Sequence, residues 1–201
     1  MSCFQPSFRL ALCIMVAALI GGCALTTDQI KLEYVPMSSG RLEGAETVKV
    51  KTEVIDLRTV KDKVSSKKNG YGMEMAPIVT VNDVSELVST SLNTELANRG
   101  FTVSGGSLLV RSELSRFYSD FKIGFWAGDA VADVIMNVQV KRPDDKIIFS
   151  KTITGQYVNP SIQLASGENA RIALNGALKD AVQKLVNDPE FINCLLDSGR
   201  L

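Results

Sequence analysis

An unbroken apolar run from Leu10 to Ile20 constrains this 201-residue chain more than any other feature of its sequence. The run is 11 residues long, whereas a helix needs about 20 apolar residues to cross a bilayer. It follows a short leader whose only charged side chain is Arg9 and ends at the small residues Gly21 and Gly22, as in a secretory signal peptide. We therefore expect residues 1–22 to be removed and the rest to be exported; the alternative is an uncleaved anchor that extends to Leu25.

The residues that close this run, Ile20-Gly21-Gly22-Cys23, resemble the lipobox of bacterial lipoproteins. The resemblance implies cleavage between Gly22 and Cys23 and attachment of diacylglyceryl to the Cys23 sulfur. Several acyl chains, palmitate among them, make such an anchor effectively permanent. Ala24 stands where lipoproteins kept at the inner membrane usually carry Asp, which implies an outer-membrane anchor and a domain that faces the periplasm. The alternative is a plain secreted protein, cleaved at the same small residues.

Charge and cysteine usage exclude several kinds of site. The chain has 22 basic and 22 acidic residues and no histidine, so it lacks the basic excess typical of nucleic-acid binding and the most common zinc ligand. Cys3 and Cys13 would leave with the signal peptide and Cys23 would carry lipid, which leaves Cys194 without a disulfide partner. Its helical spacing from Phe191 and Leu195 predicts a small buried residue, with a reactive or intermolecular thiol as the alternative. We expect no nucleic-acid partner, no metal and no cofactor.

Hydrophobic periodicity beyond the anchor predicts a single α+β domain. We divide the chain into the signal peptide (1–22), a lipidated N-terminus with a tether and short strand (23–46), and a periplasmic domain (47–201). One helix is expected to start at Thr80 or Asn82 and end at Gly100, and a second, capped by Ser166, to cover about 168–187. A last turn or two follows Pro189.

Alternation of apolar and polar residues predicts the strands, which cover 30–35, 47–58, 108–118, 129–141 and 146–158, with a brief extended piece at 101–103. On the last strand, Ile147, Phe149 and Ile153 are expected to face inward. The last three strands predict an antiparallel meander. The expected architecture is therefore a mainly antiparallel sheet with the two main helices packed on one face.

Apolar periodicity disappears between residues 59 and 75, where four lysines gather: Lys61, Lys63, Lys67 and Lys68. This pattern predicts a mobile basic loop. The loop could contact the phosphates of lipid headgroups, although a run of charges is more often simply solvated.

Aromatic and aliphatic side chains crowd the connection between the strands at 108–118 and 129–141. They are Phe121, Ile123, Phe125 and Trp126, the last being the only tryptophan of the chain. At the tip of a projecting hairpin they would form an exposed apolar patch that binds a partner protein. The alternative is that they fold back over the edge of the sheet as a satellite of the core.

Motifs for catalysis are scarce. Ser65 and Lys68, and likewise Ser119 and Lys122, have the S-x-x-K spacing of serine hydrolases in which a lysine activates the serine. Two common residues recur at one spacing by chance, and the companion S-D-N and K-T-G motifs do not occur in the sequence. We expect no enzymatic activity.

Three segments carry a resemblance to a known family: 54–58 (Val-Ile-Asp-Leu-Arg), 98–101 (Asn-Arg-Gly-Phe) and 186–191 (Val-Asn-Asp-Pro-Glu-Phe). Together with the lipobox they resemble the YajG-type family of uncharacterised bacterial lipoproteins, over residues 23 to about 196. The resemblance implies a periplasmic domain on an outer-membrane anchor and no established activity. Two functions follow: a non-enzymatic interaction or accessory module that binds an envelope protein through the aromatic connection or an open sheet edge, or a carrier that holds lipid or glycolipid chains between sheet and helices.

Overall fold

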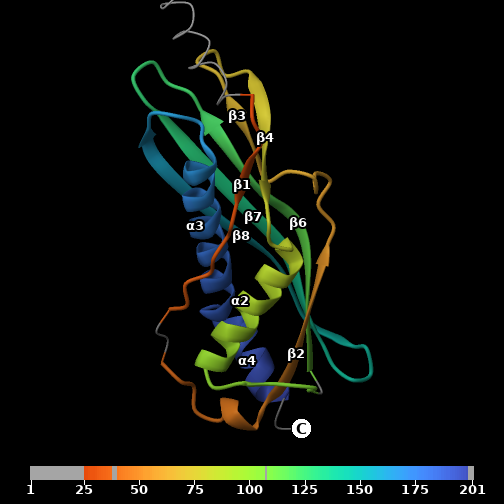
Figure 1. Cartoon of the computed structure of the whole chain (residues 1–201). Helices are drawn as coiled ribbons and strands as arrows, with labels where there is room; N and C mark the ends of the chain where they lie inside the picture. Colours follow the sequence, from red (N-terminus) through yellow and green to blue (C-terminus); the bar gives the residue numbers. More distant parts are fainter. Residues whose placement is uncertain (1–24, 38–39, 107, 199–201) are drawn as a thin grey trace, which may run out of the picture.

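A five-stranded sheet with its helices on one face forms the body of the molecule (Figure 1). The structure is a computed structural model and describes residues 25–37, 40–106 and 108–198. The strand order is β5-β2-β6-β7-β8. The bounds are β2 Lys49–Asp56, β5 Thr102–Val103, β6 Leu108–Lys122, β7 Gly128–Lys141 and β8 Ile147–Ile162.

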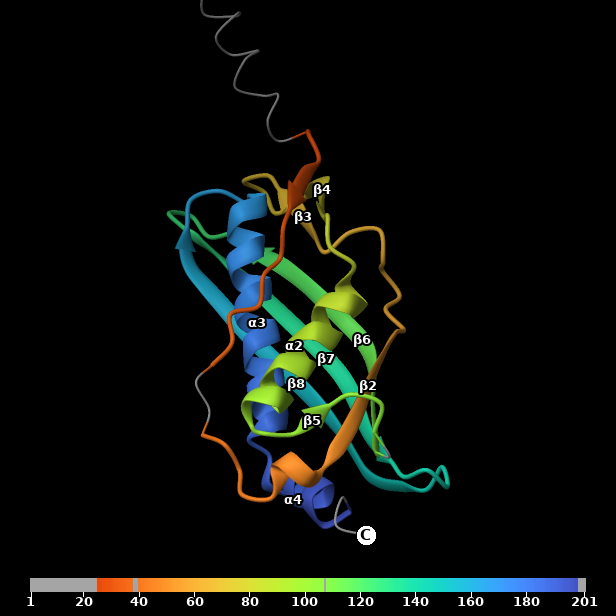
Figure 2. The same cartoon turned by 60° about the horizontal axis from the view of Figure 1, so that its bottom comes forward.

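The helices are α2 (Val84–Asn98), α3 (Gly167–Val186) and α4 (Pro189–Ser198), preceded by a short 3-10 helix, η2 (Ala45–Thr47). A smaller sheet of order β1-β4-β3 lies at one end of the molecule (Figures 1 and 2). It consists of β1 (Asp28–Ile30), β4 (Glu74–Thr80) and β3 (Ser65–Lys68).

The core lies between the large sheet and helices α2 and α3. Every second residue of β7 is fully buried, namely Ala130, Ala132, Val134, Met136, Val138 and Val140. The small side chains of α3 let that helix approach the sheet closely, and a methyl group at Gly155 of β8 would overlap the Ala177 carbonyl. The sheet and α3 are therefore in close contact, with the intervening side chains excluded from solvent.

The α+β class, the single domain and the β6-β7-β8 antiparallel meander are confirmed, but the sheet is mixed. Strand β2 pairs in parallel with both β5 and β6. Between β2 and β6 the chain passes through β3, β4, α2 and β5, and such a crossover returns the chain in the same direction.

The helix ends follow their predicted capping residues with one exception. Gly100 has a φ of 103°, in the left-handed region, as predicted after α2. Ser166 caps α3 by accepting a hydrogen bond from the Asn169 N–H. The cap of α2 is Asp83 rather than Thr80 or Asn82, because the Asp83 carboxylate accepts the Glu86 N–H at 2.9 Å.

The predicted strand at 30–35 is wrong beyond Ile30, where β1 ends. Other contacts satisfy this segment: Asn82 Oδ1 accepts the Leu32 N–H at 2.7 Å. The buried Glu95 carboxylate accepts both the Tyr34 hydroxyl and the Met37 N–H at 2.8 Å. Burial and this carboxylate raise the pKa of Tyr34 well above its usual value. Residues 31–37 therefore run along the helices instead of joining a sheet.

Ile147 is 48% exposed, so its predicted inward orientation is also wrong, whereas Phe149 and Ile153 are buried as predicted. The pairing register of β7 and β8 shifts between Val140 and Lys141, and this irregularity turns Ile147 outward.

Cys194 is half-buried beside the fully buried Leu195, and burial raises the pKa of its thiol.

Candidate interaction site

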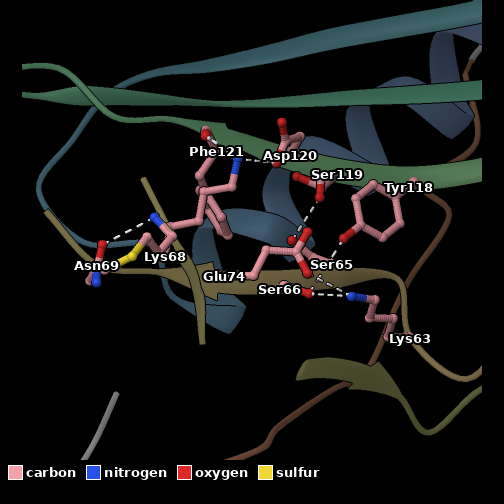
Figure 3. A network of polar contacts seen from close by, with 11 residues as sticks. Lys63, Ser65, Ser66, Lys68, Asn69, Glu74, Tyr118, Ser119, Asp120 and Phe121 are labelled. Atoms are coloured by element: carbon pink, nitrogen blue, oxygen red, sulfur yellow. Dashed lines mark hydrogen bonds and ion pairs between the residues drawn. The ribbon is translucent and has the colours of Figure 1, made fainter. Parts of the chain in front are cut away.

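Strand β3 packs against the outer edge of β6, where a loop was predicted (Figure 3). The Ser119 N–H donates to the Val64 carbonyl at 2.9 Å, and the Ser65 hydroxyl donates to the Ser119 carbonyl at 2.7 Å. Residues 65–68 form a strand that pairs with β4 and is also hydrogen-bonded to a segment more than 50 positions away in the sequence. The prediction of a mobile loop is wrong for this part of 59–75.

The four lysines of this segment are engaged within the fold. Lys63 Nζ lies 2.9 Å from Glu74 Oε2, Lys67 Nζ 2.7 Å from Asp28 Oδ1, and Lys68 Nζ 2.7 Å from Asp120 Oδ1. Lys61 donates to the Asp56 carbonyl and is the only one of the four with an exposed side chain. Contact of these lysines with headgroups stays a prediction, but most of their charge is matched inside the domain.

The electrostatics of these pairs follow from their contacts. The hydrogen bond from Lys63 lowers the pKa of Glu74, and that carboxylate raises the pKa of Lys63. Burial raises the pKa of Asp28, but the hydrogen bonds from Lys67 and from the Gly167 N–H outweigh burial and leave the pKa lowered. The ion pairs therefore hold both carboxylates in their charged form.

The two S-x-x-K pairs do not form nucleophile and base. The Ser65 hydroxyl donates to a carbonyl, while Lys68 contacts Asp120 and the Phe121 carbonyl, also shown in Figure 3. Ser119 is buried and Lys122 is exposed, since residues three apart on a strand point to opposite faces.

A cleft of about 630 Å³ opens beside β6, between the end of β2 and strand β3. Its polar lining carries both signs of charge, and its apolar lining includes an aromatic residue from β6. The lining residues are Arg58, Thr59, Val60, Lys63, Lys68, Gly72, Glu74, Ser115, Arg116, Phe117, Tyr118 and Asp120.

Part of the β6 edge in this cleft has no strand beside it. Pairing with β2 ends at Leu114, and contact with the β3 segment begins at Ser119. Because backbone groups alternate along a strand, the N–H and C=O of Phe117 point to the same edge as those of Ser119, and no described strand pairs with them there. Phe117 is only 1% exposed, so this unpaired stretch of β6 is covered and lies at the floor of the cleft.

The sequence did not predict this cleft. Arg58 follows the end of β2 and Arg116 lies on β6, and the β6–β7 register shifts between Leu114 and Arg116, where the β2 pairing has ended. Arg58 is buried against Asp56 through two hydrogen bonds of 2.9 Å, which lower the pKa of that carboxyl. Only the break in apolar alternation after Leu114 could have indicated an irregular edge.

The predicted aromatic patch is divided by the structure. Phe121 is buried at 1% exposure because β6 continues to Lys122, and Ile123 is half-buried against the core. Phe125 and Trp126 are 91% and 86% exposed and contact each other edge to face, with ring centroids 4.9 Å apart. Only these two side chains project from the connection. Gly22 and Cys23 lie outside the described residues.

Known structures define the class of fold. A DUF330 protein from Xanthomonas campestris is similar over 86% of this chain and 99% of its own, with 14% identity and a TM-score of 0.58. A putative neuraminyllactose-binding hemagglutinin homolog from Helicobacter pylori is similar over 85% and 99%, with 10% identity and a TM-score of 0.51. At these identities the likeness concerns the fold alone: this is an α+β domain of a kind already seen in bacterial proteins.

The sequence family is more specific. The model of a family described as uncharacterized lipoprotein matches residues 37–195, and the chain belongs to this family, which is the YajG-type family that the sequence resembles. No curated protein matches the chain in sequence. The match lies in the folded domain, so it supports the lipoprotein assignment independently of the lipobox.

Among the residues that the structure describes, no group of three or more acidic, histidine or cysteine side chains is placed to hold a metal ion. No helix within the same residues is long and apolar enough to cross a membrane.

Proposed function

We propose that this lipoprotein is anchored in the outer membrane through acylated Cys23, faces the periplasm, and acts as a non-enzymatic accessory module that binds an extended segment of an envelope protein. The cleft of about 630 Å³ beside β6, whose lining carries both signs of charge, is the observation that carries this proposal. Lipidation and cleavage at Cys23 rest on the lipobox and on the family.

The cleft supports recognition of a peptide for two reasons. The cleft follows β6 between the end of β2 and strand β3, so a bound extended segment would lie alongside that strand. Arg116 is 46% exposed and Asp120 49% exposed; each is ion-paired within the fold, with Asp133 and Lys68, and a segment with matching charges can add to these pairs.

The lipid-carrier alternative finds less support. The space between the large sheet and helices α2 and α3 is filled by fully buried side chains, among them Leu92, Met136, Leu174 and Leu178. The cleft beside β6, the one beside β1 and the one before α2 all lie outside this layer. Native mass spectrometry of the Cys23→Ser protein purified from cells should therefore show no lipid bound at stoichiometric amounts.

A photo-crosslinking amino acid at Val60, which lines the cleft at 40% exposure, tests the partner site in the full-length protein in cells. Val158 on β8 is 47% exposed and outside the cleft, so it is the matched control. We expect a discrete adduct from Val60 that is absent from Val158 and is lost when Arg116→Glu is added. Identical adducts from both positions, or none from Val60, would contradict the cleft as the site.

The anchor has its own test. Expressed with its native leader, the protein should carry the mass of an acylated Cys23, and Cys23→Ser should lose both the lipid and cleavage before that residue. An unlipidated chain processed at another site would contradict the anchor without affecting the cleft.

A further inference from the structure

Six exposed apolar side chains gather at the end of the molecule from which the chain leads back to Cys23. They are Leu25, Tyr71, Met73, Phe125, Trp126 and Leu164, each between 59% and 91% exposed, and we call them the apolar rim. They come from the N-terminal segment, the β3–β4 turn, the β6–β7 connection and the β8–α3 connection.

Strand pairing places the first two of these segments together. Strand β1 runs parallel to β4 with Asp28 opposite Ile78, so the residues before Asp28 run back toward the β3–β4 turn. Lys68, at the end of β3, donates to the Phe121 carbonyl near the end of β6. The turn that carries Tyr71 and Met73 therefore lies beside the β6–β7 connection.

The other two segments close the group. The start of β7 pairs with the end of β8, Gly128 opposite Ile162, which brings the β6–β7 and β8–α3 connections to the same end of the sheet. The Gly167 N–H, at the start of α3, donates to Asp28 Oδ2 at 2.8 Å. Figures 1 and 2 both show these connections toward the upper end of the molecule, where the small sheet lies.

The reach of the chain fixes where the bilayer lies. Five peptide units separate Cys23 from Asp28, so at about 3.5 Å each they span at most about 18 Å. Asp28 is held in the domain by Lys67 and Gly167. At the other end, the β7–β8 hairpin lies the length of β7 away, about 45 Å for a strand of 14 residues. A lipid on Cys23 therefore brings the apolar rim, not the opposite end, to the membrane.

The chemistry of the rim suits the membrane interface. Trp and Tyr side chains combine an apolar ring with a polar group and concentrate at the headgroup level. Three ion pairs lie around the rim, Lys68 with Asp120, Lys67 with Asp28 and Arg171 with Glu168, while the exposed Lys122 has no ion pair among the described residues. Since most of the charge is matched, the contact depends mainly on apolar insertion rather than on attraction to anionic lipids.

We propose that the apolar rim inserts into the interfacial layer of the same bilayer that holds the lipid on Cys23, so that the domain stands on the membrane in a fixed orientation. This inference rests on the proposed anchor at Cys23. It assigns Phe125 and Trp126 to the lipid surface. The β6 cleft meets the rim at Gly72 and extends to Arg58 after the end of β2, and this far part is left for the protein partner.

Trp126 is the only tryptophan of the chain, so its fluorescence reports on the rim alone. The full-length lipidated protein is reconstituted in phosphatidylcholine vesicles whose acyl chains carry bromine, and mass spectrometry of the same sample establishes that Cys23 is acylated. Insertion by ~5–10 Å should blue-shift the emission of Trp126 and quench roughly half of it or more. Adding anionic phosphatidylglycerol should leave the quenching unchanged.

The matched control moves the fluorophore to the opposite end. In a protein with Trp126→Phe and Ile147→Trp, the new indole replaces an apolar side chain that is 48% exposed beside the β7–β8 hairpin, and it should not be quenched by bromine. Acylated protein whose Trp126 emission stays water-exposed would overturn the inference and make the rim a protein-binding surface. Absence of acyl mass would instead count against the anchor, and quenching that appears only with anionic lipid would favour the lysine segment over the rim.

Discussion

The two hairpin connections that flank β7 differ in what they expose to solvent. The β6–β7 connection presents Phe125 and Trp126, whereas the β7–β8 connection presents Pro143, Asp144, Asp145 and Lys146. Both connections belong to the same sheet and the same domain, so packing alone does not account for the difference. A charged turn is typical of a solvent-exposed connection. Two exposed aromatic rings at the anchor end are not, and they indicate that this end contacts a surface other than water.

The largest expected effect on the free energy of unfolding distinguishes two phenylalanines, Phe121 at the end of β6 and Phe125 in the β6–β7 connection. Phe121→Ala should lower the free energy of unfolding by about 3–5 kcal/mol, because the ring is buried and leaves a cavity. Phe125→Ala removes an exposed ring and should change it by less than about 0.5 kcal/mol. Urea denaturation followed by circular dichroism measures both. Equal losses would show that Phe125 belongs to the core and would remove the contrast between the hairpins.

The next effect concerns the base of the anchor end. Lys67→Met leaves the Asp28 carboxylate without its ion-pair partner, and we expect a loss of about 1–2 kcal/mol, since Lys67 is mostly buried and Asp28 about one-third exposed. Lys61→Met is the control at an exposed lysine and should cost less than about 0.5 kcal/mol. The same denaturation experiment applies, and a larger loss for Lys61 would contradict the placement of β3.

A smaller effect is expected in the charged hairpin. Asp145 has a φ of 60°, in the left-handed region that β-branched residues avoid. Asp145→Val should therefore destabilise the domain by about 1–2 kcal/mol, whereas Asp145→Gly should stay within about 0.5 kcal/mol of the parent protein. Neither change should alter quenching of Trp126 in vesicles, and a change in quenching would mean that the two ends are not independent.

The smallest effect is the pH dependence of the Lys63–Glu74 pair. The hydrogen bond from Lys63 lowers the pKa of Glu74 below its usual value of 4.5. The pair therefore stabilises the fold fully above that pH and loses this contribution as the pH falls through the lower pKa of the folded state. The difference in unfolding free energy between the parent and Glu74→Gln should be constant above about pH 6 and shrink toward acid. A difference that stays constant down to about pH 2 would show that the pair does not couple to folding.

Local patterns predicted the elements whose partners are simply apolar. The stripe of α2, the alternation of β7 and the Ser166 cap of α3 could all be found because each depends on residues close in sequence. Strand β3 could not, since Ser65, Ser66, Lys67 and Lys68 have no apolar alternation, and besides pairing with β4 they are held by hydrogen bonds and ion pairs to distant segments.

The candidate sites show the same limit. The sequence predicted an aromatic connection but could not divide Phe121 from Phe125, because that division depends on how far β6 continues its pairing with β7. The cleft lies along β6 between Leu114, where pairing with β2 ends, and Ser119, where contact with the β3 segment begins. No local motif encodes such a gap. The apolar rim joins four connections that only the strand register brings together.

Amide hydrogen exchange on the lipidated full-length protein tests the central claim most directly, because one experiment reports on both hairpins. Two samples are compared: the Cys23→Ser protein in detergent-free buffer and the protein with acylated Cys23 in vesicles. In the vesicle sample, exchange should be slower at 69–73 and 123–127 and the same at 142–146. Unchanged exchange at 123–127, or equal slowing at both hairpins, would contradict a domain that stands on the membrane by its apolar rim.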